Sequence, residues 1–154
     1  MTTLQAPRAA TLPQTGPELA ATVSRHELDA LLALLRGLDD EAWDAPTDCT
    51  GWSVRDIVKH VAGAFEEAAR LRVMLRHNLT AGRRHPGRDF VDALNQLQLD
   101  DRVDRTPRML VDELAVIGPA GIRGRRRLPG MVRRIRVPAK GGLPAGSTLA
   151  YLND

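Results

Sequence analysis

The sequence has little cysteine and no long hydrophobic run, and each shortage excludes a class of protein. The single cysteine, Cys49, excludes an internal disulfide and any cysteine-rich zinc module, which suits a reducing compartment. No apolar run approaches the roughly 20 residues that a membrane-spanning helix needs. Residues 1–17 lack the apolar segment of a secretory signal peptide. We therefore expect a cytoplasmic protein that does not enter the membrane.

Aromatic residues are also scarce, at 3% of the chain, so leucine, valine and alanine must fill the interior. The 154 residues are enough for one domain with a packed core, and 43% of them are hydrophobic. Alanine and leucine are abundant, and runs of β-branched residues are few. This composition favours helices over strands, so the sequence predicts an all-α fold.

Charge is spread unevenly along the chain. Residues 1–114 hold 18 acidic and 14 basic residues, whereas residues 115–154 hold one acidic and eight basic residues. Such a basic segment is typical of proteins with an anionic partner. It has no interleaved aromatic residues and no known nucleic-acid motif, so a nucleic-acid partner is not expected. The arginines at 123–127 are interpreted as a solvated surface loop, with contact to an anionic substrate as the alternative.

Hydrophobic spacing predicts where the helices lie. Residues 1–16 show no periodicity and are expected to form a flexible tail, which leaves 17–154 as the domain. Helices are predicted over four segments, 17–38, 53–78, 90–99 and 107–117. The basic, proline-containing stretch 121–146 is expected to be irregular. Residues 147–152 resemble the beginning of a last helix, which the sequence leaves incomplete.

The strongest helix start signal is at Ser53. Its hydroxyl is a natural N-cap, and Asp56, three residues later, can return the bond as in a capping box. Trp52 and Ile57 flank the cap in the arrangement of a hydrophobic staple. The predicted apolar stripe of this helix consists of Ile57, Val61, Ala64, Ala68, Leu71 and Leu75.

His60 is the first candidate for chemistry. It lies three residues after Ile57 and four before Ala64, so it should project from the inward side of its helix. Histidine is the commonest metal ligand, but a lone histidine on an apolar face is more often structural, because a metal needs further ligands. His77 and His85 flank an arginine-rich loop and are expected to be exposed to solvent.

A more specific signal is the segment 43–61, WDAPTDCTGWSVRDIVKHV. It contains a tryptophan, a Pro-Thr turn, a Cys-x-Gly-Trp-Ser loop and a helix running from Val54 to His60. This pattern resembles the start of the mycothiol-dependent maleylpyruvate isomerase N-terminal domain, which belongs to the DinB-like superfamily. The similarity extends over residues 20–154.

The resemblance implies an up-down four-helix bundle that holds a divalent metal, often zinc, with His60 as its first ligand. In the family, the remaining ligands are an acidic residue and a histidine four positions apart on the last helix, a spacing that puts both on one face. The sequence ends at Asp154 without such a pair, and His26, His77 and His85 do not occupy matching places. Because a catalytic zinc takes three protein ligands, we expect the chain as written to lack a complete site.

The activity implied by the resemblance is that of a metal- and mycothiol-dependent isomerase or thiol transferase acting on a small molecule. With its ligands incomplete, the 154-residue chain is expected to be inactive. One alternative is a non-catalytic, truncated helical domain, and another is a binder of an anionic partner through 123–140. Cys49 lies near a helix start, which can activate a thiol, but no base lies beside it, so a small buried structural thiol is the preferred interpretation.

Overall fold

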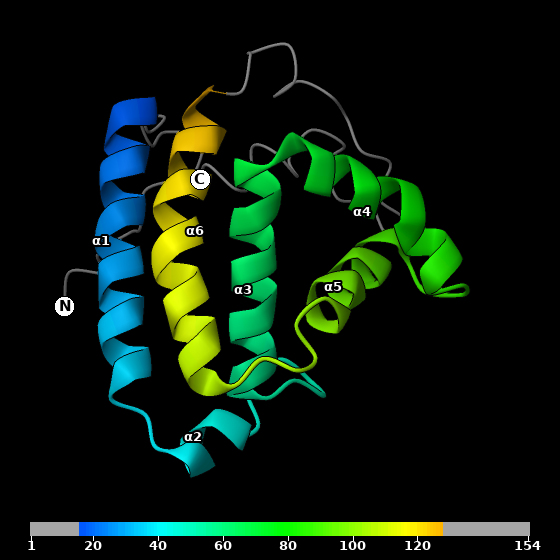
Figure 1. Cartoon of the computed structure of the whole chain (residues 1–154), viewed down its shortest axis with the longest axis horizontal. Coiled ribbons are helices and arrows are strands. Elements are labelled where there is room, and N and C mark those ends of the chain that lie inside the picture. Colours follow the sequence, from blue (N-terminus) through cyan, green and yellow to red (C-terminus); the bar gives the residue numbers. More distant parts are fainter. Residues whose placement is uncertain (1–15, 128–154) are drawn as a thin grey trace, which may run out of the picture.

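The computed structural model describes residues 16–127, which fold into helices joined by short loops (Figure 1). The helices are α1 (Pro17–Arg36), α2 (Asp40–Asp44), α3 (Val54–Ala69), α4 (Leu71–Arg84), α5 (Phe90–Asp100) and α6 (Pro107–Arg127). Within this range the only β pairing is an isolated bridge between Pro46 and Ser53. The predicted all-α fold is confirmed. The predictions for 1–15 and 128–154 lie outside the described residues.

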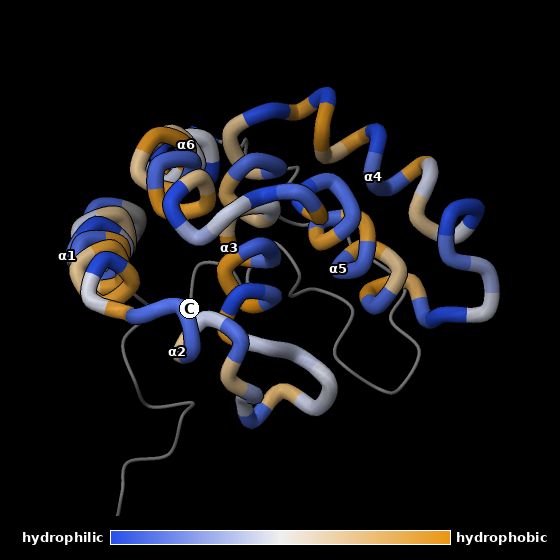
Figure 2. Tube along the Cα trace, turned by 60° about the horizontal axis from the view of Figure 1, so that its bottom comes forward, coloured by the Kyte–Doolittle hydropathy of each residue, from blue (hydrophilic) through white to orange (hydrophobic). Residues whose placement is uncertain are grey.

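Three long helices, α1, α3 and α6, run side by side around the main core, with α6 between the other two (Figure 1). Figure 2 shows hydrophobic stretches of α1 and α3 on the sides that face one another. The buried core residues are Ala21, Leu28, Leu32, Leu35, Trp43, Val58, Ala62, Leu110, Val111, Leu114 and Ile122. Burying one such leucine contributes roughly 1.5–3 kcal/mol, so this core is the main source of stability. No helix in the described range is long and apolar enough to cross a membrane.

Glycines let α6 lie close against α3. A β-carbon on Gly121 would come within 2.7 Å of the Phe65 side chain, and one on Gly124 within 2.0 Å of the Ala68 carbonyl oxygen. Glycine has low helix propensity, but here this close packing outweighs that cost. As a result α6 continues to Arg127, so the prediction of an irregular chain from residue 121 is wrong as far as the structure describes it.

The predicted single helix over 53–78 is also wrong, because it is two helices that meet at Arg70. The backbone of Arg70 is extended, with φ −132° and ψ 96°, and α4 turns away from α3 (Figure 1). Leu71 and Leu75, expected on the buried stripe, are 63% and 49% exposed. The turn instead packs α4 on α5 around a second, smaller core, which consists of Ala81, Ala93 and Leu97.

The start of α3 agrees with the prediction. The Ser53 hydroxyl accepts a hydrogen bond from the backbone N–H of Asp56 at 3.3 Å, and the Asp56 carboxylate accepts one from the backbone N–H of Ser53 at 3.2 Å, which completes the capping box. The buried stripe is displaced by one position from the prediction. Val58 and Ala62 are buried, whereas Ile57 is only partly buried.

A short helix, α2, was not predicted. The Asp39 carboxylate accepts a hydrogen bond from the backbone N–H of Ala42 at 2.9 Å and caps it, so the acidic run after α1 begins a helix. This helix carries Trp43, whose side chain is 2% exposed and belongs to the main core. α2 therefore anchors the loop that leads to α3.

Candidate functional site

The loop between α2 and α3 places an aromatic ring against His60. The backbone N–H and the hydroxyl of Thr47 both donate to the carbonyl oxygen of Trp52, at 3.0 and 2.9 Å. Gly51 has a φ of 79°, in the left-handed region that favours glycine, and it lets the loop turn back on itself. The closed loop holds the Trp52 ring edge-on to the His60 ring, with 5.3 Å between the ring centroids.

His60 lies in the second turn of α3 and is partly buried. Its Nδ1 is 2.6 Å from Oε1 of Gln98 on α5. An amide oxygen only accepts hydrogen bonds, so Nδ1 carries the proton of the neutral ring. Nε2 then keeps its lone pair, which is what an imidazole needs to bind a metal. The structure therefore agrees with an inward projection of His60 and adds a partner on another helix.

Gln98 continues a chain of polar side chains into the interior. It is 4% exposed, and its Nε2 donates to Oε1 of Glu67 at 2.8 Å. A carboxylate only accepts, which sets the amide with its nitrogen toward Glu67 and its oxygen toward His60. The same Glu67 oxygen accepts from Nδ1 of His77 at 2.6 Å, and Nε2 of His77 lies 3.0 Å from Oδ2 of Asp101. We call these five residues the polar network.

His77, expected to be exposed, is 1% exposed. Carboxylate oxygens of Glu67 and Asp101 face its two ring nitrogens, and Nη2 of Arg76 also lies 2.9 Å from Nε2. The hydrogen bond to Glu67 raises the pKa of His77 above its ordinary value, burial opposes the rise, and the bond to Asp101 adds to it. Burial acts to raise the pKa of Asp101, but His77 and Arg76, which pair with this carboxylate, lower it overall.

Helical spacing on α3 brings the network together. His60, Gly63 and Glu67 are three and four residues apart, so they share the helix face that contacts α5. A β-carbon on Gly63 would lie 2.6 Å from the β- and γ-carbons of Gln98, so the glycine allows the two helices to approach. The sequence analysis found His60 and missed the other two, although their spacing was readable. Gln98 is 38 residues away from His60 and gave no local signal.

Comparison with known families decides where this chain belongs. The family model described as mycothiol maleylpyruvate isomerase N-terminal domain matches residues 24–145. The chain belongs to this family. The match contains the signature at 43–61 and all of α2 to α6, and the helical fold agrees with the DinB-like class. Searches of curated proteins and of solved structures found no match.

This member of the mycothiol maleylpyruvate isomerase N-terminal domain family has few side chains that are placed to bind a metal together. Across residues 16–127 no group of three His, Cys, Asp or Glu side chains is placed to hold a metal. The sequence outside this range contains no histidine or cysteine, and its one acidic residue is Asp154. The assignment of His60 as a metal ligand therefore stays a prediction from the family resemblance.

Two other candidates from the sequence differ from expectation. Cys49 is exposed rather than buried, because the tight loop turns its side chain to the surface. The arginines at 123–127 form the last turn of α6 and not a loop. Arg126 pairs with Glu18 of α1 at 2.8 Å, and the Arg125 guanidinium lies over an aromatic ring of α3. In this part of the basic segment, arginine thus contributes to helix packing.

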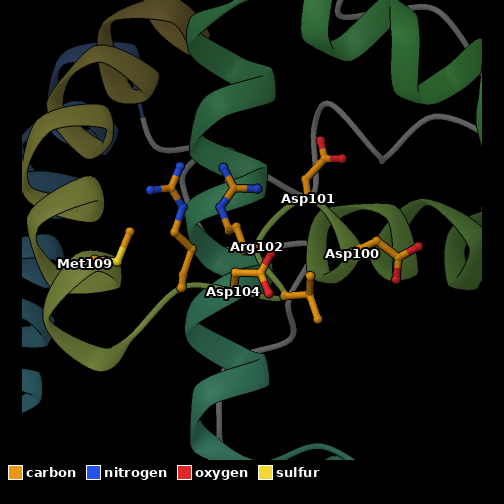
Figure 3. A pocket seen from close by; sticks show the side chains of 7 residues that line it. Asp100, Asp101, Arg102, Asp104 and Met109 are labelled. Atoms are coloured by element: carbon orange, nitrogen blue, oxygen red, sulfur yellow. The ribbon is translucent and has the colours of Figure 1, made fainter.

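A shallow pocket of about 240 Å³ lies beyond the end of α5 (Figure 3). Its lining residues are Asp100, Asp101, Arg102, Val103, Asp104, Arg105 and Met109. Asp101 already pairs with Arg76, and Asp100 lies 3.0 Å from Nε2 of His85. His85 is also partly buried, contrary to the prediction that it is exposed. Because these carboxylates serve the fold and His60 is not in the lining, we assign no ligand to this pocket.

Proposed function

We propose that this protein contributes His60 to the divalent metal centre of a mycothiol-dependent isomerase or thiol transferase, with zinc as the metal. The observation that carries the proposal is the 2.6 Å contact between Nδ1 of His60 and Oε1 of Gln98, in a member of this family. A metal-binding histidine ordinarily donates its other ring N–H to an acceptor, which orients the ring and raises its basicity. His60 has this arrangement, with Gln98 as the acceptor.

The residues fit a metal at one position. An imidazole nitrogen suits zinc, and a catalytic zinc takes three protein ligands while a fourth position stays open for water or substrate. His60 has no ligand partners among the described residues, and the rest of the sequence adds no histidine or cysteine, so we propose that the other ligands are supplied from outside these 154 residues. The 154-residue chain alone would then bind zinc weakly and be inactive.

A zinc ion at this position supplies a Lewis acid, which stabilises a thiol as thiolate or polarises a substrate oxygen. The chain's own residues orient the ligand: Trp52 restrains one side of the His60 ring, and Gln98 holds Nδ1. Following the family, we propose mycothiol as the thiol and a small molecule as the substrate. The single thiol of Cys49 suits the reducing cytoplasm in which such a cofactor would act.

Zinc titration by calorimetry tests the proposal on the 154-residue chain, on the full product of its coding sequence, which we call the extended chain, and on the His60→Ala variant of the extended chain. His26→Ala in the extended chain is the control, because His26 is an exposed residue of α1. We expect one zinc per extended chain, weak binding by the short chain, and loss of most affinity with His60→Ala. Equal binding with and without His60 would contradict the proposal. Absence of zinc binding in every protein would favour a non-catalytic helical domain.

A further inference from the structure

The polar contacts on the inner side of His60 point to a role for a residue that is not among the usual zinc ligands. We propose that Gln98 is a positioning residue that holds His60 in the tautomer with a free Nε2, and that Glu67 and His77 hold Gln98. The link to metal binding rests on the proposed function. The tautomer is a property of the metal-free chain and is tested separately.

The amide of Gln98 has a preferred orientation because of its second neighbour. Its oxygen faces Nδ1 of His60 at 2.6 Å, and its nitrogen faces Oε1 of Glu67 at 2.8 Å. A flipped amide would set its oxygen against the carboxylate oxygen, which repels it. It would also turn an N–H toward Nδ1 of His60, which favours the other tautomer. The Glu67 carboxylate therefore selects the proton position on a ring that it does not touch.

The far end of the network holds the Glu67 carboxylate in place. Its Oε1 accepts from Nδ1 of His77 at 2.6 Å as well as from Gln98. His77 is bound on its other side by Asp101, which also pairs with Arg76. These residues come from α3, α4 and the end of α5, and His77 is 1% exposed. The middle of the network, at His77 and Gln98, is therefore shielded from water, and the movement of one member disturbs the next.

Close helix packing supplies the remaining constraint. A β-carbon on Gly63 would lie 2.6 Å from the Gln98 side chain, so Gly63→Ala would push Gln98 away while leaving every polar group intact. This variant separates the position of Gln98 from its chemistry. Gln96 on the same helix is a matched control, because its amide nitrogen bonds to Asp100 and lies outside the network.

Nitrogen NMR of the His60 ring in the metal-free 154-residue chain tests the inference at about pH 8, above the ordinary pKa of imidazole. In the wild-type protein we expect a protonated Nδ1 and an unprotonated Nε2. Gln98→Leu and Gly63→Ala should shift the ring toward the Nε2-protonated form, and Gln96→Leu should leave it unchanged. A wild-type ring protonated at Nε2 would overturn the inference, even if neither variant folds. A ring tautomer that does not respond to Gln98→Leu in a folded protein would overturn it as well.

Zinc affinity in the extended chain separates the two proposals. Loss of such a hydrogen-bonded support typically weakens metal binding 10- to 100-fold, and we expect a loss on this order for Gln98→Leu. If His60→Ala lowers the zinc affinity and Gln98→Leu leaves it unchanged, the metal site stands and the positioning role is wrong. If the tautomer behaves as expected while zinc binding does not need His60, the proposed function is wrong and the positioning role stands.

Discussion

Replacing Arg102 with alanine is expected to destabilise the protein by about 3 kcal/mol. Arg102 follows α5 and is 3% exposed. Its Nη2 lies 2.8 Å from Oε2 of Glu66 on α3 and 2.7 Å from Oε1 of Glu113 on α6. Its Nε donates to the same Glu113 oxygen at 3.0 Å, and its Nη1 donates to the Gln98 carbonyl at 3.3 Å. One buried side chain therefore joins three helices.

The magnitude follows from the partners that remain. Removing one member of a buried ion pair costs roughly 3–5 kcal/mol, because the other charge loses its partner. The lower value applies because Glu66 keeps Arg70 at 2.6 Å, and Glu113 still has Arg105 at 3.9 Å. The side chains of Glu66 and Glu113 are also 17% and 24% exposed, so water reaches both carboxylates. In a chain of this length, the loss corresponds to a fall in Tm on the order of 10 °C.

Urea unfolding monitored by helical circular dichroism measures this loss. Arg105→Ala is the control, because the Arg105 side chain is 45% exposed, and a change within about 0.5 kcal/mol is expected. Arg102→Met retains much of the buried volume, so a similar loss in this variant would assign the effect to charge and hydrogen bonding. A loss below about 1 kcal/mol for Arg102→Ala, at an unchanged m-value, would refute the reasoning.

Three further predictions concern the cap, the core and pH. Ser53→Ala should cost about 1 kcal/mol because it removes the N-cap of α3, and an unchanged urea midpoint would contradict this. Trp43→Ala should lower the free energy of unfolding by roughly 3 kcal/mol or more, since Trp43 is 2% exposed. Trp52→Ala should lower it by less because Trp52 is only partly buried, and equal losses in the two variants would contradict this prediction. The folded state holds the His77 proton more tightly, so the contribution of His77 to stability should be complete below about pH 6.5 and decline as pH rises through its raised folded pKa. Urea unfolding of wild type and His77→Gln across pH tests this, and a difference that grows with pH would contradict it.

Features set by neighbouring residues could be predicted from the sequence. The Ser53 cap depends on a residue three positions away, and the helix from Pro17 depends on leucines at helical spacing, so both were found. The signature around His60 likewise led to the family, because its pattern is continuous along the chain.

Features set by distant packing could not be predicted in this way. Leu71 and Leu75 continue the apolar stripe, so nothing local marks the break at Arg70, which arises because α4 packs on α5. The burial of His77 depends on Asp101, 24 residues later. Gly121 appeared to interrupt a helix, yet its missing side chain is what lets α6 approach α3.

The most direct test of a metal centre at His60 is NMR of the extended protein loaded with cadmium in place of zinc. Cadmium has spin-half isotopes, so a nitrogen bound to it shows a resolved coupling to the metal. Because Gln98 holds Nδ1 of His60, we expect this coupling at Nε2 of His60. A coupling at Nδ1 of His60, or couplings at other histidines alone, would contradict the assignment of His60 as a metal ligand through Nε2.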